Sequence, residues 1–89
     1  MSLEELDVRG LLCPLPVIRT QQRVKQLRPG QQLEVICSDP GALIDIPAWC
    51  RLFGHRIISA GSEARGQVVR LEVNAGATLS RGHPGTLPD

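Results

Sequence analysis

Aromatic residues are nearly absent from this chain of 89 residues, which has one Trp, one Phe and no Tyr. Proteins that bind single-stranded nucleic acids stack the bases on aromatic side chains, so the shortage argues against that mode of binding. The chain also has no large excess of either charge. Its 10 Lys and Arg residues and 9 Asp and Glu residues give a formal net charge of +1. Nucleic-acid-binding proteins usually carry an excess of positive charge that attracts the phosphates. Because this chain has none, we expect no direct nucleic-acid partner.

Long apolar runs and paired cysteines are missing as well. No stretch approaches the roughly 18 apolar residues of a membrane-spanning helix, and the acidic residues 1–5 do not resemble a signal peptide. The three cysteines, at positions 13, 37 and 50, form no Cys-x-x-Cys pair, which argues against a disulfide framework or a structural zinc site. We therefore expect a cytoplasmic protein with free thiols, no metal and no membrane association.

The hydrophobic patterns predict one α+β domain. In chain order they indicate a strand at 6–8, a helix from about 13 to 27, a strand at 33–38, a helix at 42–53, and strands at 56–60 and 69–73. Because a helix joins the first two strands, they should be parallel, whereas the last two form a hairpin. The βαβαββ order predicts a two-layer α/β sandwich, with a four-stranded mixed sheet and two helices on one face. We assign residues 1–75 to this single domain and 76–89 to a disordered C-terminal tail.

The second helix has an ambiguous start because Pro47 lies inside its pattern. We place an irregular turn over 40–44 and Asp45 as the N-cap, so that the proline falls in the first turn. This frame predicts a core-facing stripe of Ile46, Trp49, Cys50 and Phe53. Cys37 is in phase with the buried positions of its strand, so we interpret both it and Cys50 as core residues rather than reactive thiols.

The segment Cys13-Pro14-Leu15-Pro16 is the part of the sequence that indicates a chemical function. A cysteine where a strand passes into a helix lies near unpaired backbone N–H groups and the positive end of the helix dipole, which favour a thiolate. No Asp or Glu occurs between Val8 and Leu33, whereas five basic residues do: Arg9, Arg19, Arg23, Lys25 and Arg28. The alternative is a small buried hydrophobe at a proline-rich helix start, and the residues alone leave both open.

This segment is part of a longer series of motifs that extends from about Leu6 to Val73. The series consists of Leu6-Asp7-x-Arg9-Gly10-Leu11-x-Cys13-Pro14-x-Pro16-Val17, Leu27-x-Pro29-Gly30, Ser38-Asp39-Pro40, Asp45-Ile46-Pro47-x-x-Cys50 and Gly54-His55. In order and spacing it resembles the signature of the TusA (SirA-like) sulfur-carrier family. One difference is Leu15, which occupies a position where some family members carry an acidic residue and makes the surface beside Cys13 more apolar.

The resemblance implies a sulfurtransferase half-reaction in which Cys13 holds sulfane sulfur as a persulfide. The sulfur would come from a donor protein, a cysteine desulfurase or a rhodanese-like protein, and pass to an acceptor protein without an organic cofactor. The sequence does not distinguish tRNA thiolation, molybdenum-cofactor assembly and sulfur oxidation as the destination. The residues that the resemblance assigns to shaping the loop around the cysteine are Pro14, Pro16, Gly10, Asp7 and Arg9.

Two other functions compete with the carrier interpretation. Arg19 and Arg23 lie on the polar side of the first helix and could dock an acidic partner, which would suit a non-enzymatic regulatory interaction module. A thiol redox protein is a weaker alternative, because no second cysteine is spaced to resolve a mixed disulfide.

Overall fold

Six elements follow one another in the predicted order in the structure, a computed structural model that describes residues 3–74. They are β1 (Leu3–Asp7), α1 (Leu15–Val24), β2 (Gln32–Cys37), α2 (Ala42–Phe53), β3 (Arg56–Glu63) and β4 (Gly66–Glu72). The expectation of a tail at 76–89 concerns residues outside those that the structure describes.

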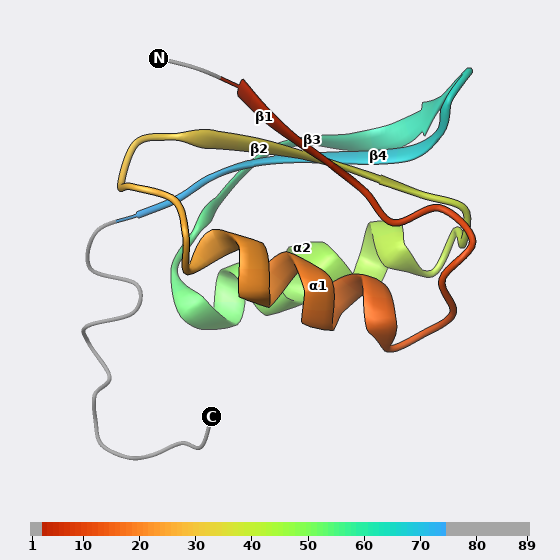
Figure 1. Cartoon of the computed structure of the whole chain (residues 1–89), viewed down its shortest axis with the longest axis horizontal. Coiled ribbons are helices and arrows are strands. Elements are labelled where there is room, and N and C mark those ends of the chain that lie inside the picture. Colours follow the sequence, from red (N-terminus) through yellow and green to blue (C-terminus); the bar gives the residue numbers. More distant parts are fainter. Residues whose placement is uncertain (1–2, 75–89) are drawn as a thin grey trace.

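The sheet is mixed and has the strand order β1-β2-β4-β3. β1 runs parallel to β2, and β4 runs antiparallel to both β2 and β3. Both helices cover the same face of this sheet (Figure 1). The predicted two-layer sandwich with helices on one face is therefore confirmed.

The helix α1 begins at Leu15, slightly later than predicted, with Pro14 at its N-cap and Pro16 in its first turn. Proline is tolerated at these positions because their N–H groups lack an intrahelical acceptor in any case. Thr20 and Val24 face the core, and the Thr20 hydroxyl donates to the carbonyl oxygen of Pro16 at 2.8 Å. The helix ends at Val24, before the predicted end near 27, and the chain continues in tighter turns.

The helix α2 begins at Ala42, so the irregular turn predicted before Asp45 and the N-cap assigned to that residue are wrong. The missed signal is Asp39, whose Oδ1 accepts the N–H of Gly41 at 2.9 Å and whose carbonyl oxygen accepts that of Ala42 at 3.0 Å. These hydrogen bonds form a turn that leads into Gly41, the N-cap residue of α2. Pro47 therefore lies inside the helix.

The core lies between the sheet and the helices and includes both predicted cysteines. Ile46 and Cys50 are completely buried there. Trp49 is only partly buried, and Phe53, predicted to face the core, is 37% exposed. The phenylalanine is the last residue of α2 and stacks on the tryptophan at the margin of the core, with ring centroids 5.6 Å apart.

The β3–β4 hairpin is longer than the sequence predicts. A polar turn is expected over 61–66, but the strands pair as far as Glu63 and Gly66, which leaves a two-residue turn. Gly66 has a φ of 137°, and a Cβ atom there would lie 2.6 Å from the carbonyl oxygen of Cys37. The residues at the end of the edge strand β3 are mostly polar and show no alternation of apolar and polar positions. The hydrophobic pattern therefore does not predict that the strand extends beyond residue 60.

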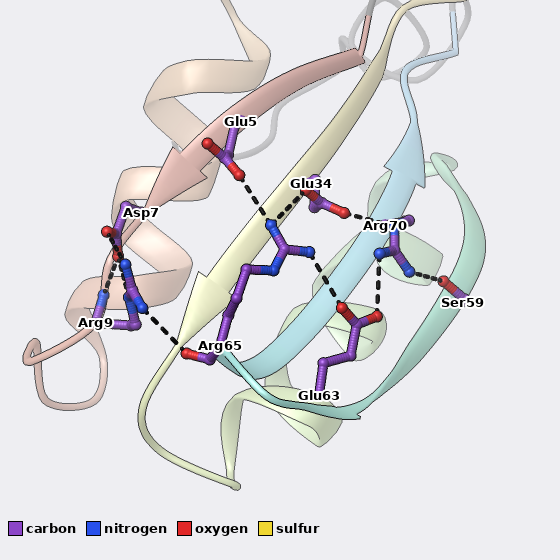
Figure 2. Close-up of polar contacts among 8 residues, drawn as sticks. All are labelled: Glu5, Asp7, Arg9, Glu34, Ser59, Glu63, Arg65 and Arg70. Carbon is purple, nitrogen blue, oxygen red and sulfur yellow. Dashed lines mark hydrogen bonds and ion pairs between the residues drawn. The ribbon is translucent and has the colours of Figure 1, made fainter.

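The strand β2 is buried on both faces. Leu33 and Val35 pack towards the helices, whereas Glu34 points to the opposite face. There the Glu34 carboxylate accepts hydrogen bonds from Arg65 Nη1 at 3.1 Å and Arg70 Nε at 2.6 Å (Figure 2). These arginines also bind Glu63, so a network of ion pairs covers the sheet face that carries no helix.

Candidate functional site

Two loops meet at one end of the molecule because β1 and β2 are parallel. The carboxyl ends of parallel strands lie at the same edge of a sheet, so the segments leading into α1 and α2 lie close together (Figure 1). Cys13 comes from the first segment and Asp39 from the second. These two residues line one small open hollow with an empty volume of about 190 Å³. Its remaining lining residues are Pro14, Pro16, Val17, Ala42 and Asp45.

Cys13 is exposed at this hollow. Its Sγ–H donates to Oδ2 of Asp45, with 3.9 Å between the two atoms. A thiol is a weak donor and this contact is long, so its importance lies in placing the carboxylate beside the sulfur. Asp45 was a residue of the sequence motifs, but its place beside the sulfur was not part of the sequence interpretation. The site therefore combines an accessible thiol with a carboxylate that lies 32 residues further along the chain.

The surroundings of Cys13 differ from the basic setting that the sequence suggests. Both charged residues that line the hollow, Asp39 and Asp45, are acidic. The start of α1 also offers few backbone donors, because Pro14 and Pro16 have no N–H and the N–H of Leu15 is donated to the carbonyl oxygen of Leu12. The hollow therefore offers fewer groups that attract an anion than the sequence suggests.

Asp7 and Arg9 form a clamp at the end of β1. The Arg9 guanidinium donates to both carboxylate oxygens of Asp7, at 2.9 and 2.7 Å, and reaches the carbonyl oxygen of Arg65 in the β3–β4 turn (Figure 2). These hydrogen bonds lower the pKa of Asp7 to about 2. Gly10 follows with a φ of 87° and donates its N–H to Oγ of Ser38. The clamp and this turn fix the direction in which the chain leaves the sheet towards Cys13.

The other two cysteines lie in the core. Cys37 and Cys50 both have 0% of their surface exposed. Burial raises the pKa of Cys37 to about 11 and that of Cys50 to about 12. At neutral pH both are therefore protonated and inaccessible, and Cys13 is the one exposed cysteine among the three in this chain.

A model of the sulfurtransferase TusA family matches residues 4–74. The chain belongs to the TusA family. This match confirms the resemblance drawn from the motifs. It covers the whole sheet, both helices and the loop that carries Cys13.

Curated relatives of this TusA-family chain come from several bacteria. YrkF of Bacillus subtilis is 34% identical over 84 residues, which are 94% of this chain but only 44% of YrkF, so the chain spans less than half of that relative. The sulfur carrier protein TusA of Pseudomonas aeruginosa is 42% identical over 59 residues, 66% of this chain and 75% of that protein. A solved SirA-like protein from Desulfitobacterium hafniense, 19% identical, has the same fold, with a TM-score of 0.70 over 82% of this chain and 99% of that one.

The two arginines predicted to form a docking face of the TusA-family domain are not equivalent. Arg19 is exposed on α1. Arg23 is only partly exposed, because its guanidinium pairs with Glu4 of β1 at 2.5 Å and also donates to Gln26. Arg23 therefore links α1 to the edge strand, and docking through both arginines stays a prediction.

Among residues 3–74 no three His, Cys, Asp or Glu side chains gather in a way that would hold a metal ion. Over the same residues, neither helix has the length and apolar character that crossing a membrane requires.

Proposed function

We propose that this protein is a sulfur carrier that accepts sulfane sulfur as a persulfide on Cys13 and relays it to an acceptor protein. The observation that carries the proposal is the exposure of Cys13, alone among the three cysteines, within a domain that belongs to the TusA family. The name of the Pseudomonas aeruginosa relative, a sulfur carrier protein, supports the same role. Three free cysteines also favour a reducing compartment, and we place the relay in the cytoplasm.

The chemistry of the relay requires an accessible sulfur and little else. Cys13 attacks the terminal sulfur of a donor persulfide, and the cysteine of the donor departs as the leaving group. The acceptor later attacks the terminal sulfur on Cys13 in the same way, and the Cys13 thiol is restored. An exposed position in an open hollow, with no second thiol at hand, allows both attacks and disfavours resolution of the persulfide within the chain.

Exposed apolar residues close in sequence to Cys13 and Asp45 favour a protein as the sulfur donor. Leu12 directly precedes Cys13, Leu15 is the first residue of α1, and Ile44 directly precedes Asp45 in α2. Their exposed fractions are 75%, 38% and 71%. We call these three residues the apolar collar. Exposed apolar residues next to a reactive group are typical of a surface that another protein covers.

Replacing Leu12 with serine is expected to slow loading from a cysteine desulfurase by about tenfold, because a side chain buried in an interface contributes about 1–2 kcal/mol to binding. Loading from a low-molecular-weight persulfide should stay within about twofold of the wild-type rate, since that reaction needs no docking. Initial rates with the two donors measure both effects. Leu52→Ser is the matched control, because Leu52 is 78% exposed but lies towards the other end of α2. Equal slowing in both variants would contradict the role of the collar.

The location of the sulfur tests the proposed function. The wild-type chain is incubated with a cysteine desulfurase and cysteine, the persulfide is trapped by alkylation, and the peptides are mapped by mass spectrometry. We expect one extra sulfur on the peptide that contains Cys13, released by a reducing agent. Sulfur on the peptides of Cys37 or Cys50, or on none, would contradict the proposal.

A further inference from the structure

The carboxylate beside the thiol gives Cys13 a partner for its proton. Resting on the proposed function, we propose that Asp45 accepts the proton of Cys13 Sγ as this sulfur attacks the donor persulfide. The observation behind it is the contact in which Sγ–H donates to Asp45 Oδ2 at 3.9 Å. An attacking sulfur must lose its proton, and this oxygen is already placed to receive it.

The thiol needs such a partner because the site does little to hold an anion. The start of α1 has two prolines without N–H groups, and the N–H of Leu15 is already donated to Leu12. Of the two arginines nearest in sequence, Arg9 is paired with Asp7, and Arg19 is exposed on α1 and does not line the hollow. Among residues 3–74 no cationic side chain lines the hollow, and the charged group in contact with Cys13 Sγ is the Asp45 carboxylate.

Of the two carboxylates at the hollow, Asp45 is the one available for this task. Asp39, on the loop before α2, accepts the N–H of Gly41 in the turn that leads into that helix. Within residues 3–74, the side chain of Asp45 makes no hydrogen bond or ion pair other than the contact with Cys13. The segment from α1 contributes only Pro16 and Val17 to the hollow, so no other titratable side chain lines it.

The transfer balances without any further reactant. A bond forms between Cys13 Sγ and the terminal sulfur of the donor, and the sulfur–sulfur bond of the donor breaks. The electron pair of the broken bond stays on the donor cysteine. The proton passes from Sγ to Asp45 Oδ2 and then through solvent to the departing thiolate. The products are Cys13 persulfide and the donor thiol, and no external oxidant or reductant is consumed.

The test compares Asp45→Asn with Asp39→Asn, which removes the other charge of the hollow while keeping an acceptor for the N–H of Gly41. The donor is glutathione persulfide, so that docking of a protein plays no part. Initial rates of persulfide formation are measured by intact-protein mass spectrometry from about pH 6 to about pH 10, a range that spans the ionisation of an ordinary thiol. Circular dichroism establishes that both variants are folded.

We expect Asp45→Asn to load about 100-fold more slowly than wild type at neutral pH. The two rates should converge at alkaline pH, where hydroxide takes the proton in place of Asp45, and Asp39→Asn should stay within about twofold throughout. Unchanged or faster loading of Asp45→Asn would overturn the inference, and so would a loss of equal size at every pH, which indicates a structural role. Wild-type protein that gains no sulfur on Cys13 would overturn the proposed function itself, which distinguishes the two failures.

Discussion

The variant Cys13→Ser is expected to lose sulfur transfer completely. A hydroxyl does not form a persulfide, and neither of the other two cysteines can take over. Both are fully buried, and burial holds their pKa at about 11 and about 12. The thiolate is the nucleophile in sulfur exchange, so buried protonated thiols react very slowly. The measurement is the amount of sulfur passed from a loaded donor through this protein to an acceptor thiol.

Matched controls for this variant are Cys37→Ala and Cys50→Ala. Each removes a core thiol and leaves the Cys13 loop intact, so transfer should stay near the wild-type level in the folded fraction. Both substitutions remove buried volume, and a stability measurement for each accounts for any unfolded protein. Transfer that persists in Cys13→Ser, or that disappears in Cys50→Ala while the fold is retained, would show that another sulfur is the carrier.

The variant Glu34→Gln is expected to lower the free energy of unfolding by about 2 kcal/mol. Only 8% of the Glu34 side chain is exposed, and its carboxylate joins Arg65 and Arg70. Removing its charge leaves the guanidinium groups of Arg65 and Arg70 with Glu63 alone as their shared partner. The side chains of Arg65 and Arg70 are 38% and 30% exposed, so water can solvate their guanidinium groups. The loss of stability is therefore smaller than the about 3–5 kcal/mol that results when one partner of a fully buried ion pair is removed. Urea unfolding followed by the fluorescence of Trp49 measures the change.

Glu5→Gln is the control for this effect, because Glu5 also pairs with Arg65 but is 57% exposed. An exposed ion pair contributes little, so we expect a change of less than about 1 kcal/mol. A loss as large as that of Glu34→Gln would show that burial is not what makes Glu34 important.

The stability of the protein at acid pH provides a second test of the role of Glu34. The hydrogen bond from Arg65 is the main cause that lowers the pKa of Glu34 from its usual 4.5, opposed by burial and assisted by the hydrogen bond from Arg70. A carboxylate with a lowered pKa stabilises the folded state above pH 4.5, and this contribution is lost as the pH falls through the folded-state pKa. The stability difference between wild type and Glu34→Gln should therefore shrink below pH 4.5. A difference that stays constant there would contradict the assignment.

The sequence predicts the order of strands and helices and their packing into two layers well, because hydrophobic periodicity determines both. Alternation at Leu33 and Val35 and the helical spacing of Thr20 and Val24 report local structure and burial at the same time. The start of α2 is predicted wrongly because Pro47 is assigned to a first turn that Asp45 caps. In the structure the N-cap is Gly41, and the side chain of Asp39 accepts its N–H in the turn before the helix.

The electrostatics of the site are harder to predict, because counting charges along the chain does not show how they pair. Of the five basic residues around Cys13 in sequence, Arg9 binds Asp7 and Arg23 binds Glu4, and none of the five lines the hollow. The position of Asp45 beside the sulfur depends on α1 and α2 starting at the same edge of the sheet. That arrangement follows from the predicted parallel pairing of the first two strands, so the sequence contains the information at the level of topology. The shortage of N–H donors at the prolines is also visible in the sequence, whereas the distance to the carboxylate is not.

Intact-protein mass spectrometry in two steps tests the carrier role most directly. The protein is first loaded with glutathione persulfide and freed of donor, and then mixed with an acceptor thiol. We predict that wild type gains the mass of one sulfur atom in the first step and loses it in the second, while Cys13→Ser gains none. A chain that gains no sulfur although Cys13 is open to alkylation, or one that is loaded equally after Cys13→Ser, would contradict the assignment of this protein as a sulfur carrier.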